Sequence, residues 1–203
     1  MSKLYISYNQ IHNSIRDSVE RYHINEEFKP DLMIAIGGGG FIPARMLRTF
    51  LKKTERGNIP IQAIGLSLYE ELENANGEEK PGTQVQKTQW LNFGASHSEI
   101  SLLGRRILIV DEVDDTRTTL AFAVEELQKD IEAEEIRKGM KPGESNTTLG
   151  VFVLHNKLKE KKRELPEEIM KNYFAAVEMP DQWLVYPWDA TDIDSHTELA
   201  KKD

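Results

Sequence analysis

The chain has 203 residues, a formal net charge of −8 and no cysteine. The length suits one domain of ~100–200 residues, and the lack of cysteine excludes disulfides, thiolate catalysis and the common zinc modules. The scattered, mainly acidic charge argues against nucleic-acid binding, and no apolar run approaches the ~18 residues of a membrane span. We therefore expect one domain over residues 1–203, located in the cytoplasm, with no nucleic-acid or membrane partner.

An N-terminal helix and four buried strands are predicted from the apolar pattern. Ile11, Ile15 and Val19 lie four residues apart and predict a helix over residues 8–21. Short runs rich in β-branched residues predict strands at Leu32 to Ile36, Ile59 to Leu66, Ile107 to Val110 and Gly150 to Leu154.

Two further helices separate these strands. One apolar stripe runs from Ile42 to Leu51, and a second runs from Leu120 to Ile131 and is ended by Gly139. Alternating strands and helices favour an α/β fold with a mainly parallel sheet flanked by helices. Binding sites in such folds lie at the carboxyl ends of the strands.

Two segments do not fit this alternation. Residues 69–101 are polar and too long for an ordinary connection, so they are either a functional loop, which we favour, or a disordered insertion. From Asn172 the pattern changes to short β-like pieces broken by prolines, which predicts a small C-terminal cap. We expect a core at about residues 28–155 and a cap at about 172–203, with the N-terminal segment packed nearby.

The segment after the third predicted strand carries the most chemistry. Four carboxylates, Asp111, Glu112, Asp114 and Asp115, are followed by Thr116, Thr118 and Thr119. Carboxylates at a strand end bind divalent cations or sugar hydroxyls, and threonines at a helix N-terminus suit a phosphate. Helix capping alone would explain Asp115 and Thr116, but it does not explain the acid pair that directly follows a buried strand.

A run of four glycines, residues 37–40, follows the first predicted strand. It is either a tight structural turn or a loop that binds an anion. It is not a dinucleotide fingerprint, because Ile42 stands where a third glycine is required, and it lacks the Gly-Lys-Ser/Thr of a Walker loop.

The segment ILIVDEVDDTRTTL resembles the phosphoribosyl pyrophosphate (PRPP) signature of type I phosphoribosyltransferases. The segments IAIGGGGFIPARMLRTFL, AIGLSLYEEL, TQW, FVLHNK and MPDQWLVYPWDATDI extend the resemblance to the fungal hypoxanthine-guanine and xanthine phosphoribosyltransferases. These enzymes join PRPP to a 6-oxopurine and release pyrophosphate. The resemblance implies the type I phosphoribosyltransferase fold, a Mg²⁺ cofactor and a homodimer.

The resemblance also implies roles for the PRPP-binding residues. Asp111 and Glu112 would hold the ribose hydroxyls, and Asp115, Thr116, Arg117, Thr118 and Thr119 would surround the 5′-phosphate. Arg117 departs from the family, in which many members have glycine; its guanidinium either contacts phosphate or points away. Gly38, Gly39 and Gly40 would form the pyrophosphate loop, with a cis peptide bond expected between Gly38 and Gly39. Related enzymes commonly have Lys or Arg where Gly38 stands.

The same resemblance assigns the base, the metal and a lid. Asp115 is the candidate to move a proton near purine N7. Lys157, Trp183 and the backbone of Leu184 would bind the base, although composition alone makes a core position for Trp183 equally credible. Asp111, Glu112 and Asp189 would lie at the metal. Ser67 and Tyr69 would begin a flexible loop that closes over the site.

Two questions stay open from the sequence. GLSLYEEL, LNFG and WLVYPWDATDIDSHT look slightly closer to the xanthine-active yeast members, but the preferred base is not decided. The alternative function is a PRPP-binding regulator of the same fold without transferase activity. The net charge of −8 and the missing basic helix-turn-helix argue against that alternative.

Overall fold

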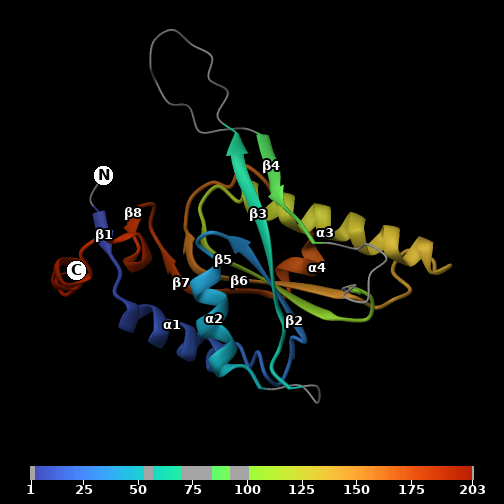
Figure 1. Ribbon diagram of the computed structural model, residues 1–203, viewed down its shortest axis with the longest axis horizontal. Coiled ribbons are helices and arrows are strands. Elements are labelled where there is room, and N and C mark those ends of the chain that lie inside the picture. The colour runs from blue at the N-terminus through green and yellow to red at the C-terminus, as the bar shows by residue number, and fades with distance from the viewer. Residues whose placement is uncertain (1–2, 53–56, 70–83, 92–100, 203) are drawn as a thin grey trace, which may run out of the picture.

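The computed structural model describes residues 3–52, 57–69, 84–91 and 101–202, in which a central sheet lies between layers of helices (Figure 1). The strand order is β4-β3-β2-β5-β6-β7. The strands are β2 (Leu32–Gly37), β3 (Ile61–Tyr69), β4 (Gln84–Gln89), β5 (Arg106–Asp114), β6 (Thr148–Lys157) and β7 (Tyr173–Met179). All neighbours pair in parallel except β3 and β4, so the predicted mainly parallel sheet is confirmed.

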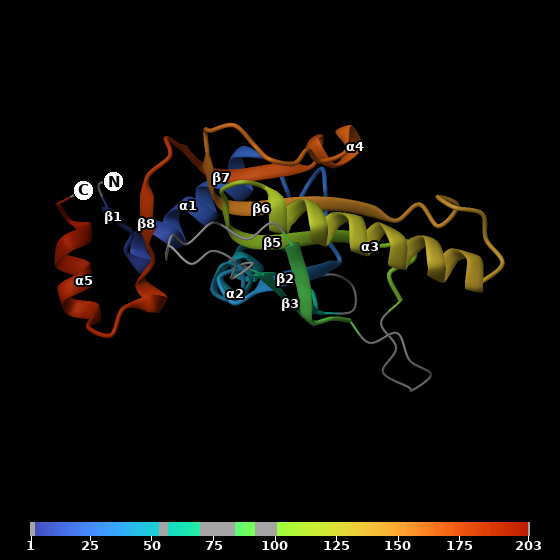
Figure 2. The same ribbon diagram turned by 90° about the horizontal axis from the view of Figure 1, so that it is seen from above.

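Alternation along the strands sends side chains to two separate cores. Met33, Ala35, Leu108 and Val110 pack beneath α1 (Tyr8–Arg21) and α2 (Phe41–Phe50) on one face. Ile34, Ile36, Ile107 and Ile109 pack beneath α3 (Thr118–Arg137) and α4 (Glu167–Met170) on the other face. Figure 1 shows α3 above the central sheet and α1 and α2 below it, and Figure 2 gives the same arrangement seen from above. Both faces are buried, which is why the strands read as continuous apolar runs.

The helix boundaries follow from local chemistry. Ser7 caps α1 through a reciprocal capping box with Gln10. Gly139 follows α3 with φ 75°, a left-handed conformation that a residue without a side chain adopts at little cost. None of the helices in the described ranges is both long and apolar enough to cross a membrane.

The C-terminal region differs from the sequence expectation at one strand. β7 is the edge strand of the central sheet, paired in parallel with β6, and therefore does not belong to a cap. The prolines that break the pattern, Pro180 and Pro187, lie after β7 and after β8 (Trp183–Val185). Their position, and not Asn172, marks where the chain leaves the sheet.

A small cap lies beside the sheet. It consists of β1 (Lys3–Tyr5) paired in parallel with β8, the 3₁₀ turn η1 (Pro187–Asp189) and α5 (Ile193–Ala200) (Figure 1). The N-terminal segment thus packs against the C-terminal one. His196 Nε2 lies 2.9 Å from the carbonyl oxygen of Ile6 and ties α5 to the strand pair.

Candidate active site

A cavity of about 330 Å³ lies at the carboxyl ends of β2 and β5. It is lined by Gly37, Gly38 and Gly39, by Leu66 at β3, by Lys162 and by the run from Asp111 to Leu120. We call Gly37–Gly40 the glycine loop and Asp111–Thr119 the acid segment. The two segments are far apart in the sequence and meet here because β2 and β5 are neighbours in the sheet.

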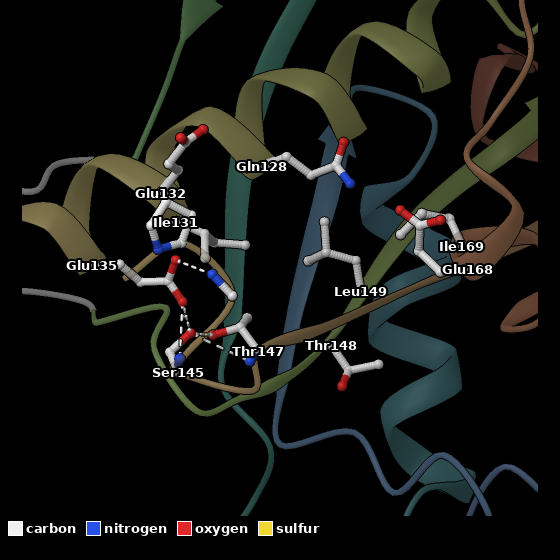
Figure 3. A pocket seen from close by; sticks show the side chains of 12 residues that line it. Gln128, Ile131, Glu132, Glu135, Ser145, Thr147, Thr148, Leu149, Glu168 and Ile169 are labelled. Atoms are coloured by element: carbon white, nitrogen blue, oxygen red, sulfur yellow. Dashed lines mark hydrogen bonds between the residues drawn. The ribbon is translucent and has the colours of Figure 1, made fainter. Parts of the chain in front are cut away.

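A second cavity, of about 450 Å³, lies near the opposite end of the sheet between α3 and the start of β6 (Figure 3). The carboxylate of Glu135 points into this region, but it already accepts hydrogen bonds from the hydroxyl of Ser145 and from the backbone N–H groups of Ser145 and Gly143. These bonds lower the pKa of Glu135 and close the turn between α3 and β6. The polar group is therefore used structurally, and the first cavity is the candidate site.

The acid pair lies at the floor of the first cavity. Asp111 is 7% exposed, and its Oδ1 accepts a 2.9 Å hydrogen bond from the backbone N–H of Glu112. Burial, together with the neighbouring carboxylate of Glu112, raises the pKa of Asp111 well above its usual value. A ligand that weakens the repulsion between the carboxylates of Asp111 and Glu112 would have to supply hydroxyl donors or a cation.

The glycine loop makes close backbone approaches. A Cβ at Gly39 would lie 1.9 Å from Cδ of Glu112, and one at Gly40 would lie 2.5 Å from the carbonyl oxygen of Val110. Gly38, in contrast, has open space around it. The cis peptide bond lies between Gly37 and Gly38, one residue before the expected Gly38–Gly39 bond.

The end of the acid segment turns into α3. Thr116 and Thr118 hydroxyl oxygens lie 2.9 Å apart, and the backbone N–H of Lys162 donates to the carbonyl of Thr116. Arg117, the residue before the helix, has φ 66° and supplies no side-chain cap. The first amides of α3 are therefore not occupied by that side chain.

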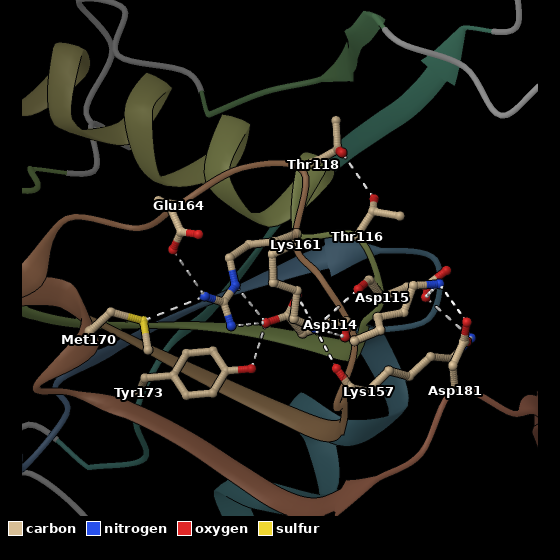
Figure 4. Close-up of polar contacts among 12 residues, drawn as sticks. Asp114, Asp115, Thr116, Thr118, Lys157, Lys161, Glu164, Met170, Tyr173 and Asp181 are labelled. Atoms are coloured by element: carbon tan, nitrogen blue, oxygen red, sulfur yellow. Dashed lines mark hydrogen bonds and ion pairs between the residues drawn. The ribbon is translucent and has the colours of Figure 1, made fainter.

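The guanidinium of Arg117 belongs to a buried polar cluster that includes Asp114 and Tyr173, both labelled in Figure 4. Its Nε and Nη2 donate to Asp114 Oδ2 at 2.9 and 2.8 Å, and Tyr173 donates to the same oxygen at 2.7 Å. Lys161 Nζ donates to the carbonyl oxygens of Asp114 and Asp115. The guanidinium is thus bound to Asp114, and a contact between Arg117 and phosphate stays a prediction.

Asp115 belongs to a group of four charges at the rim (Figure 4). Lys157 Nζ lies 3.3 Å from carboxylate oxygens of both Asp115 and Asp181, and Lys159 Nζ lies 2.8 and 3.0 Å from the same two carboxylates. Hydrogen bonds to Asp115 and Asp181 raise the pKa of Lys159. Asp181 lies between β7 and β8, and no sequence pattern singled it out.

The cap carries the aromatic candidate. Trp183 is 59% exposed, which rules out the core position that composition allowed. Leu184 is half-buried and packs against the core beneath α1 and α2. Trp188, the other tryptophan of the cap, stacks on Tyr186 with ring centroids 4.5 Å apart. Of the two tryptophans in the cap, Trp183 is thus the more exposed one.

The predicted metal ligands are not gathered into one cluster. Asp111 and Glu112 lie in the cavity, whereas Asp189 is exposed on η1. Within the described ranges, no group of three or more His, Cys, Asp or Glu side chains could hold a metal ion. Any cation there would need oxygen ligands from a bound substrate in addition to one or two carboxylates.

The predicted lid lies mostly outside the described residues. Ser67 is exposed on β3, and Tyr69 is the last residue of that strand; they pair with Gln86 and Gln84 of β4. The segment QVQKTQ has no apolar alternation, so its pattern predicts part of a loop where the structure has β4. Residues 70–83 and 92–100 are not described.

Curated relatives match nearly the whole chain. The chain is 56% identical over 201 residues to the hypoxanthine-guanine phosphoribosyltransferase of Schizosaccharomyces pombe, covering 98% of this chain and 95% of that protein. It is 52% identical over 202 residues to xanthine phosphoribosyltransferase 1 of Saccharomyces cerevisiae, with the same coverage of 98% and 95%. No family model matches.

Two solved structures are similar to the chain over nearly its whole length. A hypothetical protein from Neisseria gonorrhoeae with bound ppGpp has a TM-score of 0.75 at 40% identity, covering 99% of this chain and 97% of that one. A purine phosphoribosyltransferase from Pyrococcus horikoshii has a TM-score of 0.61 at 26% identity, covering 95% and 97%. With these identities and this coverage, the chain belongs to the hypoxanthine-guanine and xanthine phosphoribosyltransferase family of purine salvage enzymes.

Proposed function

We propose that the cavity binds PRPP and that the chain transfers its phosphoribosyl group to a 6-oxopurine, releasing pyrophosphate. The observation that carries this proposal is that the acid segment and the glycine loop line one cavity of about 330 Å³. One segment offers carboxylates for a diol, and the other offers backbone amides for an anion.

The acid segment suits a ribose 5-phosphate. Asp111 and Glu112 would accept hydrogen bonds from the ribose hydroxyls, which relieves the charge repulsion between the buried carboxylate of Asp111 and its neighbour Glu112. The hydroxyls of Thr116, Thr118 and Thr119 and the first amides of α3 would hold the phosphate at the positive end of the helix. Arg117 contributes through its backbone, since its side chain is bound to Asp114.

The base would lie between the cap and the four-charge group. Trp183 offers its exposed ring for stacking, the backbone of Leu184 offers hydrogen bonds to the ring edge, and Lys157 offers a donor to the 6-oxo group. As N9 attacks the anomeric carbon, the bond to pyrophosphate breaks, and the electron pair leaves with pyrophosphate. Asp115 would accept the proton that the base loses.

Mg²⁺ is the proposed cofactor, held by Asp111 or Glu112, with Asp189 near it, and by oxygens of PRPP. The donor set fits, because the two carboxylates that line the cavity, Asp111 and Glu112, supply hard oxygen ligands of the kind that Mg²⁺ takes alongside substrate phosphates. When bound, the ion would neutralise charge on the pyrophosphate. The chain's own contribution would be the glycine loop, where Gly39 and Gly40 leave room for a close backbone approach.

A direct assay tests this function. Pyrophosphate release from PRPP and Mg²⁺ is measured separately with hypoxanthine, guanine, xanthine and adenine at equal concentrations. We expect release with 6-oxopurines and not with adenine, and the ranking of the three 6-oxopurines identifies the preferred base. PRPP binding without release with any base would contradict the transferase and support the regulator.

The assembly and compartment are part of the same proposal. We infer a homodimer from the family resemblance and a cytoplasmic location from a composition without cysteine. Size-exclusion chromatography with light scattering tests the first, and fluorescence microscopy of a tagged full chain tests the second.

A further inference from the structure

A buried chain of hydrogen bonds connects β6, the cap and the acid segment. His155 Nδ1 lies 2.9 Å from the hydroxyl oxygen of Tyr186, and this hydroxyl donates a 3.1 Å hydrogen bond to the backbone carbonyl of Glu112. Tyr186 is 6% exposed and His155 is 5% exposed. None of the roles proposed above uses either side chain.

The direction of both hydrogen bonds follows from counting protons. A carbonyl oxygen can only accept, so the single proton of the Tyr186 hydroxyl goes to Glu112. His155 must then donate from Nδ1 to the hydroxyl oxygen. Burial lowers the pKa of His155 to about 4, so its ring is neutral at neutral pH and carries one proton, which this arrangement places on Nδ1.

Each end of this chain is held in place by its own neighbours. On the cap side, Tyr186 directly follows β8, stacks on Trp188 and belongs to the core beneath α1 and α2. On the other side, the carboxylate of Glu112 occupies the space that a Cβ at Gly39 would fill. The Tyr186 hydroxyl therefore joins a cap that carries Trp183 to the backbone of a residue at the floor of the cavity.

We propose that Tyr186 is a positioning residue whose hydroxyl sets the distance between a base stacked on the cap and a ribose bound by the acid segment. The proposal rests on the proposed function, since it takes Trp183 as the base platform and Glu112 as the ribose ligand. Bond formation between N9 and the anomeric carbon requires a separation near 3–3.5 Å, and a misplacement of about 1 Å costs up to about 100-fold in rate. The Tyr186 hydroxyl holds the cap against the backbone of Glu112, the proposed ribose ligand. It therefore acts on this separation without touching either substrate.

The first test measures binding and does not depend on turnover. Dissociation constants of a purine nucleoside 5′-monophosphate and of PRPP with Mg²⁺ are measured by calorimetry for wild type and Tyr186→Phe. The nucleotide spans both halves of the site, so we expect its affinity to fall about tenfold, while PRPP affinity changes less than about twofold. An equal loss for both ligands, or no loss for the nucleotide, would overturn the proposal.

The second test separates positioning from stability. Tyr22→Phe is a matched control, because the Tyr22 hydroxyl also donates to a backbone carbonyl, that of Ala175, at 3.1 Å. We expect Tyr186→Phe to lower kcat about tenfold with little change in either KM, and Tyr22→Phe to leave kcat unchanged while thermal stability falls by a similar amount in both. Equal kcat values in the two variants would show a structural role only.

A third variant keeps the inference testable if Tyr186→Phe folds poorly. His155→Leu removes the donor to Tyr186 and leaves the tyrosine in place; we expect a smaller fall in kcat and in nucleotide affinity, and a double variant no worse than Tyr186→Phe alone. If the effects of His155→Leu and Tyr186→Phe add in the double variant, the two side chains do not act as one connected unit. If wild type binds the nucleotide but releases no pyrophosphate, the proposed function fails while the binding test still decides this inference.

Discussion

Charge at the rim of the cavity is balanced among four side chains. Lys157 and Lys159 each contact both Asp115 and Asp181, so either carboxylate can lose its charge while the lysines keep one partner. The two aspartates therefore differ in position and not in their cationic partners. Asp115 lies on the acid segment that lines the cavity, whereas Asp181 lies on the connection between β7 and β8.

Asp115→Asn removes the proposed proton acceptor. We expect kcat to fall by about 10²–10⁴-fold, the usual contribution of a positioned acid or base. Steady-state pyrophosphate release measures the change, with thermal unfolding measured beside it. Asp181→Asn is the matched control, because it removes a carboxylate from the same two lysines and should cost less than about fivefold. Equal losses in the two variants would assign the effect to the ion pairs and not to proton transfer.

Trp183→Ala removes the exposed ring on the cap. Stacking of a base on an aromatic side chain contributes about 1–3 kcal/mol, so we expect the KM for the base to rise about tenfold or more and the KM for PRPP to change little. Ile193→Ala is the control, because Ile193 is also an exposed apolar residue of the cap, at 42% exposure. A parallel rise of both KM values would speak against a platform for the base.

At the scale of elements, the site depends on the residues at the carboxyl end of each strand. β2 ends at Gly37, the first of four glycines, and the last residues of β5 include Asp111 and Glu112; the parallel pairing of these strands brings the two ends together. The contact is so close that the carboxylate of Glu112 occupies the place that a Cβ at residue 39 would take. The left-handed conformation of Arg117 at the start of α3 is held by the buried Asp114, which fixes where the helix amides begin.

Gly39→Ala and Gly38→Ala compare two neighbouring positions of the glycine loop. A Cβ at residue 39 would collide with the carboxylate of Glu112, whereas nothing lies within 4 Å of one at residue 38. The carboxylate of Glu112 is the end of a flexible side chain, so a methyl group at residue 39 would displace it from its place as the proposed ribose ligand. We therefore expect PRPP affinity to fall about tenfold for Gly39→Ala and less than about twofold for Gly38→Ala, since one charge-assisted hydrogen bond contributes about 1.5–3 kcal/mol. Calorimetry with PRPP and Mg²⁺ gives both values. A larger loss at residue 38 would contradict the proposed contact.

At the scale of the whole molecule, a hydrogen bond between two buried side chains joins the cap to the sheet. His155 contacts Tyr186 from β6, and burial holds the pKa of His155 at about 4 instead of its ordinary 6.5. The unfolded chain therefore binds more protons than the folded one between these values. The stability of the fold should consequently depend on pH in that range.

The free energy of unfolding is expected to fall as pH decreases from 6.5 to 4. Above pH 6.5, His155 is neutral in both the folded and the unfolded chain, and the contribution of the lowered pKa to stability is fully present. As pH falls to about 4, the unfolded chain binds a proton at His155 that the folded chain does not, and the free energy of unfolding falls by roughly 3 kcal/mol. Urea unfolding at several pH values measures it, with His155→Gln as the reference that removes the titrating group. The difference between wild type and reference should shrink toward low pH. A constant difference would show that His155 is not buried neutral.

The residues that determine the family could be identified from the sequence, because each depends on local order along the chain. An apolar strand followed directly by Asp111 and Glu112, and a helix opened by threonines, place chemistry at a strand end whatever the rest of the fold does. The same holds for the four central strands, whose two buried faces make them continuously apolar. β4 and the assignment of β7 to the sheet were not predictable in this way, because an edge strand is defined by its neighbour and not by its own pattern.

Contacts between distant segments were decided only by the tertiary structure. Nothing local distinguishes Asp181 from other turn aspartates, or an Arg117 that faces phosphate from one that pairs with Asp114 and Tyr173. The exposure of Trp183 and the burial of Tyr186 likewise depend on how the cap meets the sheet. Local order determined which residues stand at the strand ends. The packing of segments as far apart as Ile6 and His196, which are 190 residues apart in the sequence, decided where those side chains point.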